Sequence, residues 1–291
     1  MKYLTKEWYE TMQRTGLHIL LRPLEEARSF SEELFQRLYA ECEQEHLDSE
    51  KRVCDVDITE LADRLSDSSV SRVDGTPISE EERNAVAAFQ QIVVKSLREA
   101  PQRIFDPEKA KAEYHERYLG SLENAQRKLP DEIKQKIADL RVFALRYAAP
   151  EIIEEVTAYS NACDEFVKQT MKNCSEQQKA LFADCRPGFF EHYDIHDHHV
   201  KSARFSRKDL ILEPFDPYDW IYTFKDAEIL EQEHSLDDAY LLYDEIYPVD
   251  GGYEFHFLFD ARMGDGYEIS QITLRCSDLE ITTAPVQEEL S

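Results

Sequence analysis

The sequence predicts an α+β fold, with an all-helical N-terminal domain in residues 1–190 and an antiparallel β-sheet domain in residues 191–291. Before the Arg186-Pro-Gly188 segment, apolar residues recur every three or four positions behind helix-capping residues, as on one face of a helix. After it they alternate with polar residues, which is typical of strands. The chain has 291 residues, of which 42% are hydrophobic, so each domain can bury a core.

The first predicted helix lies in residues 3–13, with Thr5 as its cap and Gly16 as its end. Apolar side chains fall on one face of this segment, so the helix is amphipathic. Its two large aromatic residues, Trp8 and Tyr9, are expected to anchor it to the body of the domain, in preference to stacking on a ligand.

A second helix is predicted from a capping box formed by Ser29 and Glu32 to about His46. Within it, Glu43 and His46 form an ExxH pair, a motif that di-iron helical bundles use in duplicate together with further carboxylates. The helical part contains no second ExxH pair. We therefore interpret this pair as a surface feature that holds no metal.

Turn formers and caps mark the remaining helices. A short helix is expected at residues 59–65, followed by an exposed loop to Pro77. Four longer helices are expected to start at Ser79, Asp106, Pro130 and Pro150.

Three cysteines, Cys163, Cys174 and Cys185, follow one another at intervals of eleven residues near the end of the helical part. Ser175 with Gln178 resembles a fresh helix cap, so we expect an interruption there. Eleven residues span about 16 Å along a helix. That separation is too large for shared metal ligation, and we expect the cysteines to be small buried residues.

An antiparallel sheet of five to seven strands is predicted in the final third of the chain. Runs rich in β-branched and aromatic residues follow one another there, separated by turn formers. The expected strands are residues 200–205, 209–213, 220–230, 240–247, 253–259 and 267–283. Pro248-Val-Asp-Gly-Gly252 is the clearest hairpin turn. In the strand after it, Tyr253, Phe255, Phe257 and Phe259 share one face, which we expect to pack on the core.

Charge and cysteine content restrict the partners and the compartment. The chain carries 60 acidic and 34 basic residues, a formal charge of -26 that repels phosphate backbones and anionic lipids. We therefore expect no nucleic acid and no membrane partner. The first 20 residues lack an uninterrupted apolar signal core, and the six cysteines form no CxxC pair. Both observations favour a reduced, cytoplasmic protein.

One cluster could carry chemistry. His196, Asp197, His198 and His199 form a dense run at the junction of the two predicted domains. Imidazoles with a carboxylate suit a divalent transition metal such as zinc. Further ligands could come from His192, Asp194 or His256, with His234 as a reserve. A metal held there with an open position could activate water for hydrolysis.

The alternative interpretation of this cluster is structural. His196 and Asp197 would bond each other or the backbone at the entry to the sheet and fix the junction. Adjacent residues of an extended segment point in opposite directions, so these side chains cannot all bind one ion without a turn. The order of residues does not fit the HxHxDH motif of metallo-β-lactamases. Nor does the chain contain a phosphate-binding glycine loop or a GxSxG motif.

Several segments resemble a family of uncharacterised bacterial proteins of unknown function. They are the residues 4–13, His196-Asp197, Phe224-Lys-Asp-Ala-Glu-Ile229, Tyr243-Asp-Glu-Ile-Tyr247 and Gly252-Tyr-Glu-Phe-His256. The resemblance implies a bacterial, cytoplasmic protein and assigns no activity. The final third is also similar to small sheet domains of immunity-like bacterial proteins, which is an analogy at the level of the fold.

We therefore predict a non-catalytic, cytoplasmic protein that works through protein contacts and needs no cofactor. Aromatic residues of the predicted strands form either a binding face or part of the core; they are Tyr218, Trp220, Tyr222, Tyr240 and Tyr243. The alternative function is a divalent-metal-dependent hydrolase or metal-binding protein that uses the cluster at His196–His199.

Overall fold

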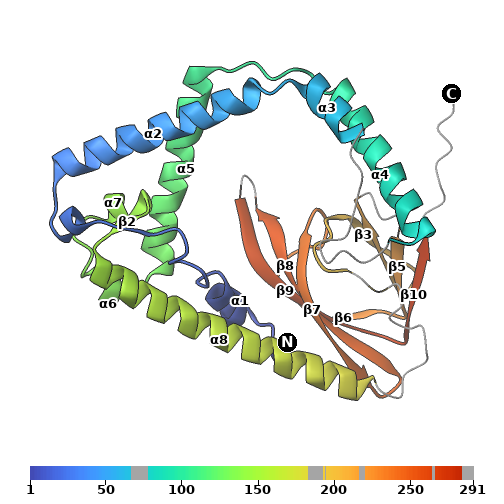
Figure 1. The fold of residues 1–291 in the computed structure, drawn as a ribbon. Coiled ribbons are helices and arrows are strands. Elements are labelled where there is room, and N and C mark those ends of the chain that lie inside the picture. The colour runs from blue at the N-terminus through green and yellow to red at the C-terminus, as the bar shows by residue number, and fades with distance from the viewer. Residues whose placement is uncertain (67–77, 183–192, 194, 216–219, 264–265, 284–291) are drawn as a thin grey trace. The chain divides into compact units, whose positions relative to one another are not determined.

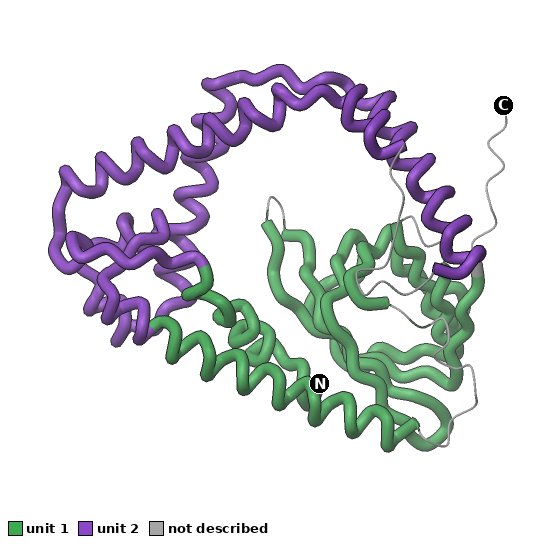
Figure 2. Tube along the Cα trace, viewed as in Figure 1, with its two compact units in different colours: residues 1–19, 156–291 green, residues 20–155 purple. Residues whose placement is uncertain are grey.

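The computed structural model describes the chain apart from residues 67–77, 183–192, 194, 216–219, 264–265 and 284–291. The contacts divide it into two compact units (Figure 2): unit 1 is Met1–Ile19 with Val156–Ser291, and unit 2 is Leu20–Glu155. The predicted fold class is confirmed, because helices fill the N-terminal half and antiparallel sheets the C-terminal half (Figure 1). The predicted domain boundary after residue 190 lies outside the described residues.

Unit 2 is built mainly from helices. Its elements are β1 (Arg22–Pro23), the 3-10 helix η1 (Glu25–Arg28), α2 (Glu32–Cys54), α3 (Ile58–Ser66), α4 (Glu80–Glu99), α5 (Pro107–Lys128), α6 (Asp131–Lys134), α7 (Leu140–Ala144) and β2 (Tyr147–Ala148). The long helix α8 (Pro150–Leu181) starts in unit 2 and continues into unit 1. None of the described helices has both the length and the apolar character needed to cross a membrane.

Most helix starts follow the predicted caps. The side chain of Ser79 accepts a hydrogen bond from the backbone of Glu82, whose carboxylate bonds back to the Ser79 backbone, which completes a capping box. The Asp106 carboxylate accepts from the first backbone N–H groups of α5. Local hydrogen bonds therefore set these boundaries without help from distant parts of the chain.

Three predicted helices differ from the structure in their boundaries. Helix α2 is capped by Ser31, because Ser29 ends the preceding 3-10 helix, and it continues past His46 to Cys54. The segment after Pro130 forms two short helices, since Asp139 caps a new start at α7. Helix α8 runs through Ser175 without a break.

The core of unit 2 lies where α2, α5 and α7 meet. Leu34 and Leu38 of α2 pack with Tyr114 and Tyr118 of α5 and with Val142 of α7. The short strands β1 and β2 pair in parallel beside them. Residues from α2, α5, α7 and β2 thus meet around one apolar cluster.

Unit 1 contains two four-stranded antiparallel sheets instead of the single sheet predicted. One has the order β10-β5-β4-β3 and the other β6-β9-β8-β7. The strands are β3 (Val200–Ser206), β4 (Asp209–Pro214), β5 (Trp220–Lys225), β6 (Glu228–Gln232), β7 (Tyr240–Val249), β8 (Gly252–Met263), β9 (Gly266–Cys276) and β10 (Asp278–Thr283).

The second sheet arises because two predicted strands each turn midway. Between β5 and β6 the chain turns at Asp226, whose φ is +46°. Between β9 and β10 it turns at Ser277, which bonds back to Lys225. Each turn moves the chain from one sheet to the other, so the predicted single strands become corners of a two-sheet structure.

The two sheets of unit 1 share one core. Phe224 of β5 contacts Phe255 of β8 with ring centroids 5.0 Å apart. Phe255, Phe257 and Phe259 are fully buried, as their alternation in β8 predicts. The hairpin before β8 is also confirmed, and its Gly252 is required because a Cβ there would lie 1.9 Å from the carbonyl oxygen of Cys276.

Helices α1 (Lys6–Met12) and α8 pack together in unit 1 (Figure 1). Thr5 caps α1 by accepting a hydrogen bond from the backbone of Trp8. Trp8 is buried against Tyr243 of β7, with ring centroids 4.8 Å apart, so it anchors α1 as predicted. Val167 and Cys174 of α8 complete this cluster.

Candidate functional site

The predicted metal-binding run is part of the backbone ladder that joins the two sheets. The Asp197 backbone N–H donates to the Leu241 carbonyl over 2.9 Å, and the Leu241 N–H donates to the His198 carbonyl over 2.8 Å. His199 also forms a bridge with Tyr240, the first residue of β7. Residues 197–200 are therefore held against β7 just before they enter β3 of the other sheet.

The imidazoles of this run lie in different surroundings. His196 is half-exposed beside Tyr243, with its Nε2 3.4 Å from the Asp197 carboxylate. His198 is buried near Tyr222. Asp197 has a φ of +61°, so the segment is not the uniformly extended strand that the alternation argument assumes.

His199 belongs to a separate brace. Its Nε2 lies 2.8 Å from Asp238 Oδ1, while Arg262 donates to Asp238 Oδ2 over 2.6 Å. The hydrogen bond from Arg262, with a further one from His199, lowers the pKa of Asp238 below its usual value. The brace connects the entry of β3, the start of β7 and the end of β8.

The remaining predicted ligands do not join these histidines in the described structure. His192 and Asp194 lie outside the described residues. His256 bonds Glu254 over 3.0 Å on β8, and His234 bonds Ser270 over 2.7 Å. Within the described ranges, no three His, Cys, Asp or Glu side chains are grouped to hold a metal ion.

Metal binding at His196, Asp197, His198 and His199 stays a prediction. It is tested by elemental analysis of the purified protein beside its His196→Ala and His198→Ala variants. A stoichiometric metal that is lost in both variants is the result that the metal-binding hypothesis requires. A wild-type protein without bound metal contradicts that hypothesis.

The aromatic residues expected on a sheet face are largely covered. Tyr222 is in the core, and Trp220 is partly buried and packs against that core. Tyr243 lies beneath Trp8 and Tyr9 of α1. Tyr218 lies outside the described residues. Tyr222, Trp220 and Tyr243 therefore agree with the core alternative, whereas Tyr240 is only partly buried and pairs with His199 at the start of β7.

A buried carboxylate that the sequence reasoning missed holds the N-terminal segment. Glu245 of β7 is 1% exposed, and its oxygens accept backbone hydrogen bonds from Lys2, Tyr3 and Leu4 over 2.6–2.9 Å. The Tyr247 hydroxyl donates to the same carboxylate. No local sequence signal could have found this contact, because its partners are more than 240 residues apart.

The contacts of Glu245 keep it charged. Burial by itself raises the pKa of Glu245, but hydrogen bonds from Tyr247 and from the backbone of residues 2–4 outweigh it and lower the pKa below 4.5. On the neighbouring strand, burial lowers the pKa of His256. These buried ionisable groups and their hydrogen bonds stabilise the fold.

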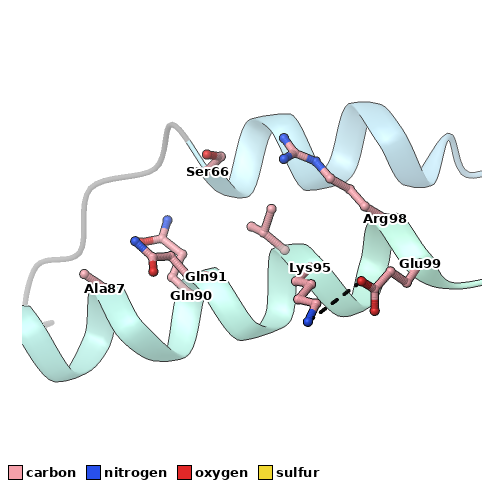
Figure 3. A pocket seen from close by; sticks show the side chains of 8 residues that line it. Ser66, Ala87, Gln90, Gln91, Lys95, Arg98 and Glu99 are labelled. Carbon is pink, nitrogen blue, oxygen red and sulfur yellow. Dashed lines mark ion pairs between the residues drawn. The ribbon is translucent and has the colours of Figure 1, made fainter. Parts of the chain in front are cut away.

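Unit 2 carries a different kind of surface on the hairpin of α3 and α4. A groove of about 550 Å³ is lined by side chains of α4 and by Ser66 at the end of α3. Figure 3 shows these side chains. Arg98 of α4 reaches Asp63 of α3 over 2.8 Å, and Lys95 pairs with Glu99. The groove is lined mostly by polar side chains, while Val94 is buried between the helices.

The opposite face of α4 is apolar and uncovered. Phe89 is 68% exposed and Ile92 is 64% exposed. At 100° per residue these two side chains lie across the helix from Val94, the residue buried against α3. With Ala85 and Ala88 they form a continuous patch, which we call the α4 stripe (Ala85, Ala88, Phe89 and Ile92).

Comparison with known proteins identifies the family. A family model described as "Protein of unknown function (DUF4085)" matches residues 116–266, which is more than half of the chain. The chain belongs to this family. Comparisons with curated proteins and with solved structures returned no match.

The part of the chain that matches the DUF4085 family runs from α5 to the start of β9. It contains the junction at His196–His199, the Asp238 brace and Glu245. The α4 stripe precedes the matched residues. Membership therefore covers α6 to β8 with most of α5 and supplies no activity for either unit.

Proposed function

We propose that the protein is a non-catalytic, cytoplasmic interaction protein and that the α4 stripe is its binding surface. The observation that carries this proposal is the exposure of Phe89 and Ile92 side by side on one helix. Single exposed apolar residues are common on protein surfaces, whereas contiguous ones mark interaction sites. A two-helix hairpin can cover one face of α4 with α3 and leaves the opposite face for a partner.

The spacing of the stripe favours a helix as the partner. Ala85, Phe89 and Ile92 follow one another at intervals of four and three residues, which is the spacing of a coiled-coil seam. Such a seam accepts side chains of a facing helix between its own. We therefore infer that the partner contributes an amphipathic helix.

Charge complementarity favours a second copy of the same chain. Glu81 and Lys95 lie seven residues before and seven residues after Ala88, on the same flank of the stripe. If two α4 helices cross antiparallel at Ala88, Glu81 of each copy faces Lys95 of the other. The stripe then covers itself around a two-fold axis, which is the commonest symmetry of soluble dimers.

Light scattering on the full chain tests this proposal. The wild-type protein should have twice the mass of one chain, and Phe89→Glu should reduce that mass to one chain because it places a charge in the seam. Phe166→Glu is the matched control, since Phe166 is 51% exposed on a different helix, α8, and is not part of the α4 stripe. A wild-type protein that stays monomeric at high concentration contradicts the proposal.

A further inference from the structure

A second cavity, entirely within unit 2, differs from the rest of this acidic chain in its charge. It has a volume of about 370 Å³ and lies between α2, α5 and the segment around β1 and β2. Three guanidinium groups line it, from Arg22, Arg117 and Arg146, against the single carboxylate of Glu45. Unlike the chain as a whole, this cavity favours an anion.

The two helices present their lining residues in the same pattern. Cys42, Glu45, His46 and Ser49 of α2 follow the intervals of one helix face, and so do Tyr114, Arg117, Tyr118 and Ser121 of α5. Both faces therefore point their side chains into one space. The cavity is built by regular elements whose positions are set by the unit 2 core.

The imidazole of His46 has a buried nitrogen atom that could donate or accept a hydrogen bond to a ligand. It is 8% exposed, which corrects the interpretation of the ExxH pair as a surface feature. Its ring stacks on Tyr114, with centroids 5.7 Å apart. Its Nε2 is buried and has no hydrogen-bond partner among the described residues. A buried polar atom without a partner is costly, so a bound ligand is the natural partner for it.

Two of the three arginines, Arg117 and Arg146, are also available to a ligand. Arg22 bonds the Tyr147 hydroxyl over 3.2 Å and lies 4.0 Å from Glu45. By contrast, the guanidinium groups of Arg117 and Arg146 make no ion pair or side-chain hydrogen bond within the described part of the chain. Arginine binds phosphate through two parallel hydrogen bonds, which a lysine cannot reproduce.

The other lining groups favour binding over covalent chemistry. Burial raises the pKa of the Cys42 thiol, so the thiol stays protonated and is a poor nucleophile. Burial also raises the pKa of Tyr114. Tyr114, Tyr118 and Leu145 add an apolar wall beside the cations. The walls suit a ligand with a charged end and a flat or apolar body.

We propose that this cavity binds a small phosphate monoester, with Arg117 and Arg146 on the phosphoryl oxygens, His46 Nε2 as an additional partner, and Tyr114 against the ester group. A phosphate monoester carries a charge close to −2 at neutral pH, whereas a carboxylate carries −1. Three arginines therefore suit a phosphate monoester better than a single carboxylate. The proposal is independent of the α4 stripe, which uses other residues of unit 2.

Calorimetric titration of the full-length protein with phenyl phosphate tests the proposal. We expect saturable binding of one ligand per chain, with an affinity that falls as salt is added. The double variant Arg117→Gln/Arg146→Gln should weaken binding by at least about tenfold. His46→Phe should also weaken it, because this change keeps the stacked ring and removes Nε2.

The matched control is Arg127→Gln, which removes an exposed arginine of the same helix outside the cavity. It should leave the affinity unchanged. If Arg127→Gln and the double variant lose the same amount of affinity for phenyl phosphate, the proposal is overturned. An absence of saturable binding to the wild-type protein also overturns it. Benzoate that binds as tightly as phenyl phosphate overturns the assignment to a phosphate. Thermal unfolding of each variant separates lost binding from lost folding.

Discussion

The apolar residues of β8 and of α4 are similar in kind and opposite in environment. Phe255, Phe257 and Phe259 of β8 are fully buried between the two sheets of unit 1. Phe89 and Ile92 of α4 are mostly exposed on a two-helix hairpin of unit 2. A strand in the middle of a two-sheet structure finds cover within the chain, whereas the outer face of a hairpin does not. The comparison separates residues that hold the fold from residues available to a partner.

The largest expected difference in stability is between substitutions at Phe257 of β8 and at Phe89 of α4. Phe257→Ala should lower the free energy of unfolding by about 3–5 kcal/mol, because it leaves a cavity in a packed core. Phe89→Ala should change it by less than about 0.5 kcal/mol at concentrations where the chain is monomeric, since its ring is exposed. Urea denaturation measures both. Equal losses would show that the α4 stripe is packed within the monomer.

A smaller effect sharpens the account of unit 1. Glu245→Ala should lower the free energy of unfolding by about 2–4 kcal/mol, because it removes the acceptor for three backbone N–H groups and the Tyr247 hydroxyl. Urea denaturation at neutral pH measures this change. A loss below about 0.5 kcal/mol would mean that the N-terminal segment is held by other contacts.

The same carboxylate predicts an acid dependence. The pKa of Glu245 is lowered in the folded state, so its contribution is complete above an ordinary pKa of 4.5 and is lost as the pH falls through the folded value. Glu245→Gln, which cannot ionise, should flatten the fall in the thermal midpoint below pH 4.5. An unchanged acid profile in Glu245→Gln would rule out this contribution.

The sequence predicts what local hydrogen bonds and alternation decide. Ser79 and Asp106 cap helices as expected, and the hairpin at Gly252 begins β8 with its phenylalanines on one face. The split into two sheets depends on turns at Asp226 and Ser277 that resemble continuous strand in the sequence. Long-range contacts are beyond local patterns, which explains why neither the Glu245 contacts nor the Asp238 brace could be predicted.

The candidate sites divide in the same way. A run of histidines is visible in the sequence, but the directions of its side chains depend on the left-handed backbone at Asp197 and on pairing with β7. The cavity at His46 could have been suspected from the matching intervals in α2 and α5. That those two faces meet, however, is decided by packing at Leu38 and Tyr118.

A small gain in stability is expected within unit 2. A Cβ at Gly120, inside α5, meets no atom within 4 Å. Gly120→Ala should therefore raise the free energy of unfolding by about 0.5–1 kcal/mol, because alanine has the higher helix propensity and a less flexible unfolded chain. Thermal unfolding measures it. A lower midpoint would indicate that the α5 surface at this position is covered.

The most direct test of the central claim, that α4 pairs antiparallel with a second copy, is a charge-reversal cycle followed by light scattering across a dilution series. Lys95→Glu and Glu81→Lys should each weaken the dimer by about tenfold through like-charge contacts between copies. The double variant Glu81→Lys/Lys95→Glu should regain the wild-type dissociation constant. A double variant as weak as the single ones, or a wild-type chain that is monomeric throughout, would contradict the claim.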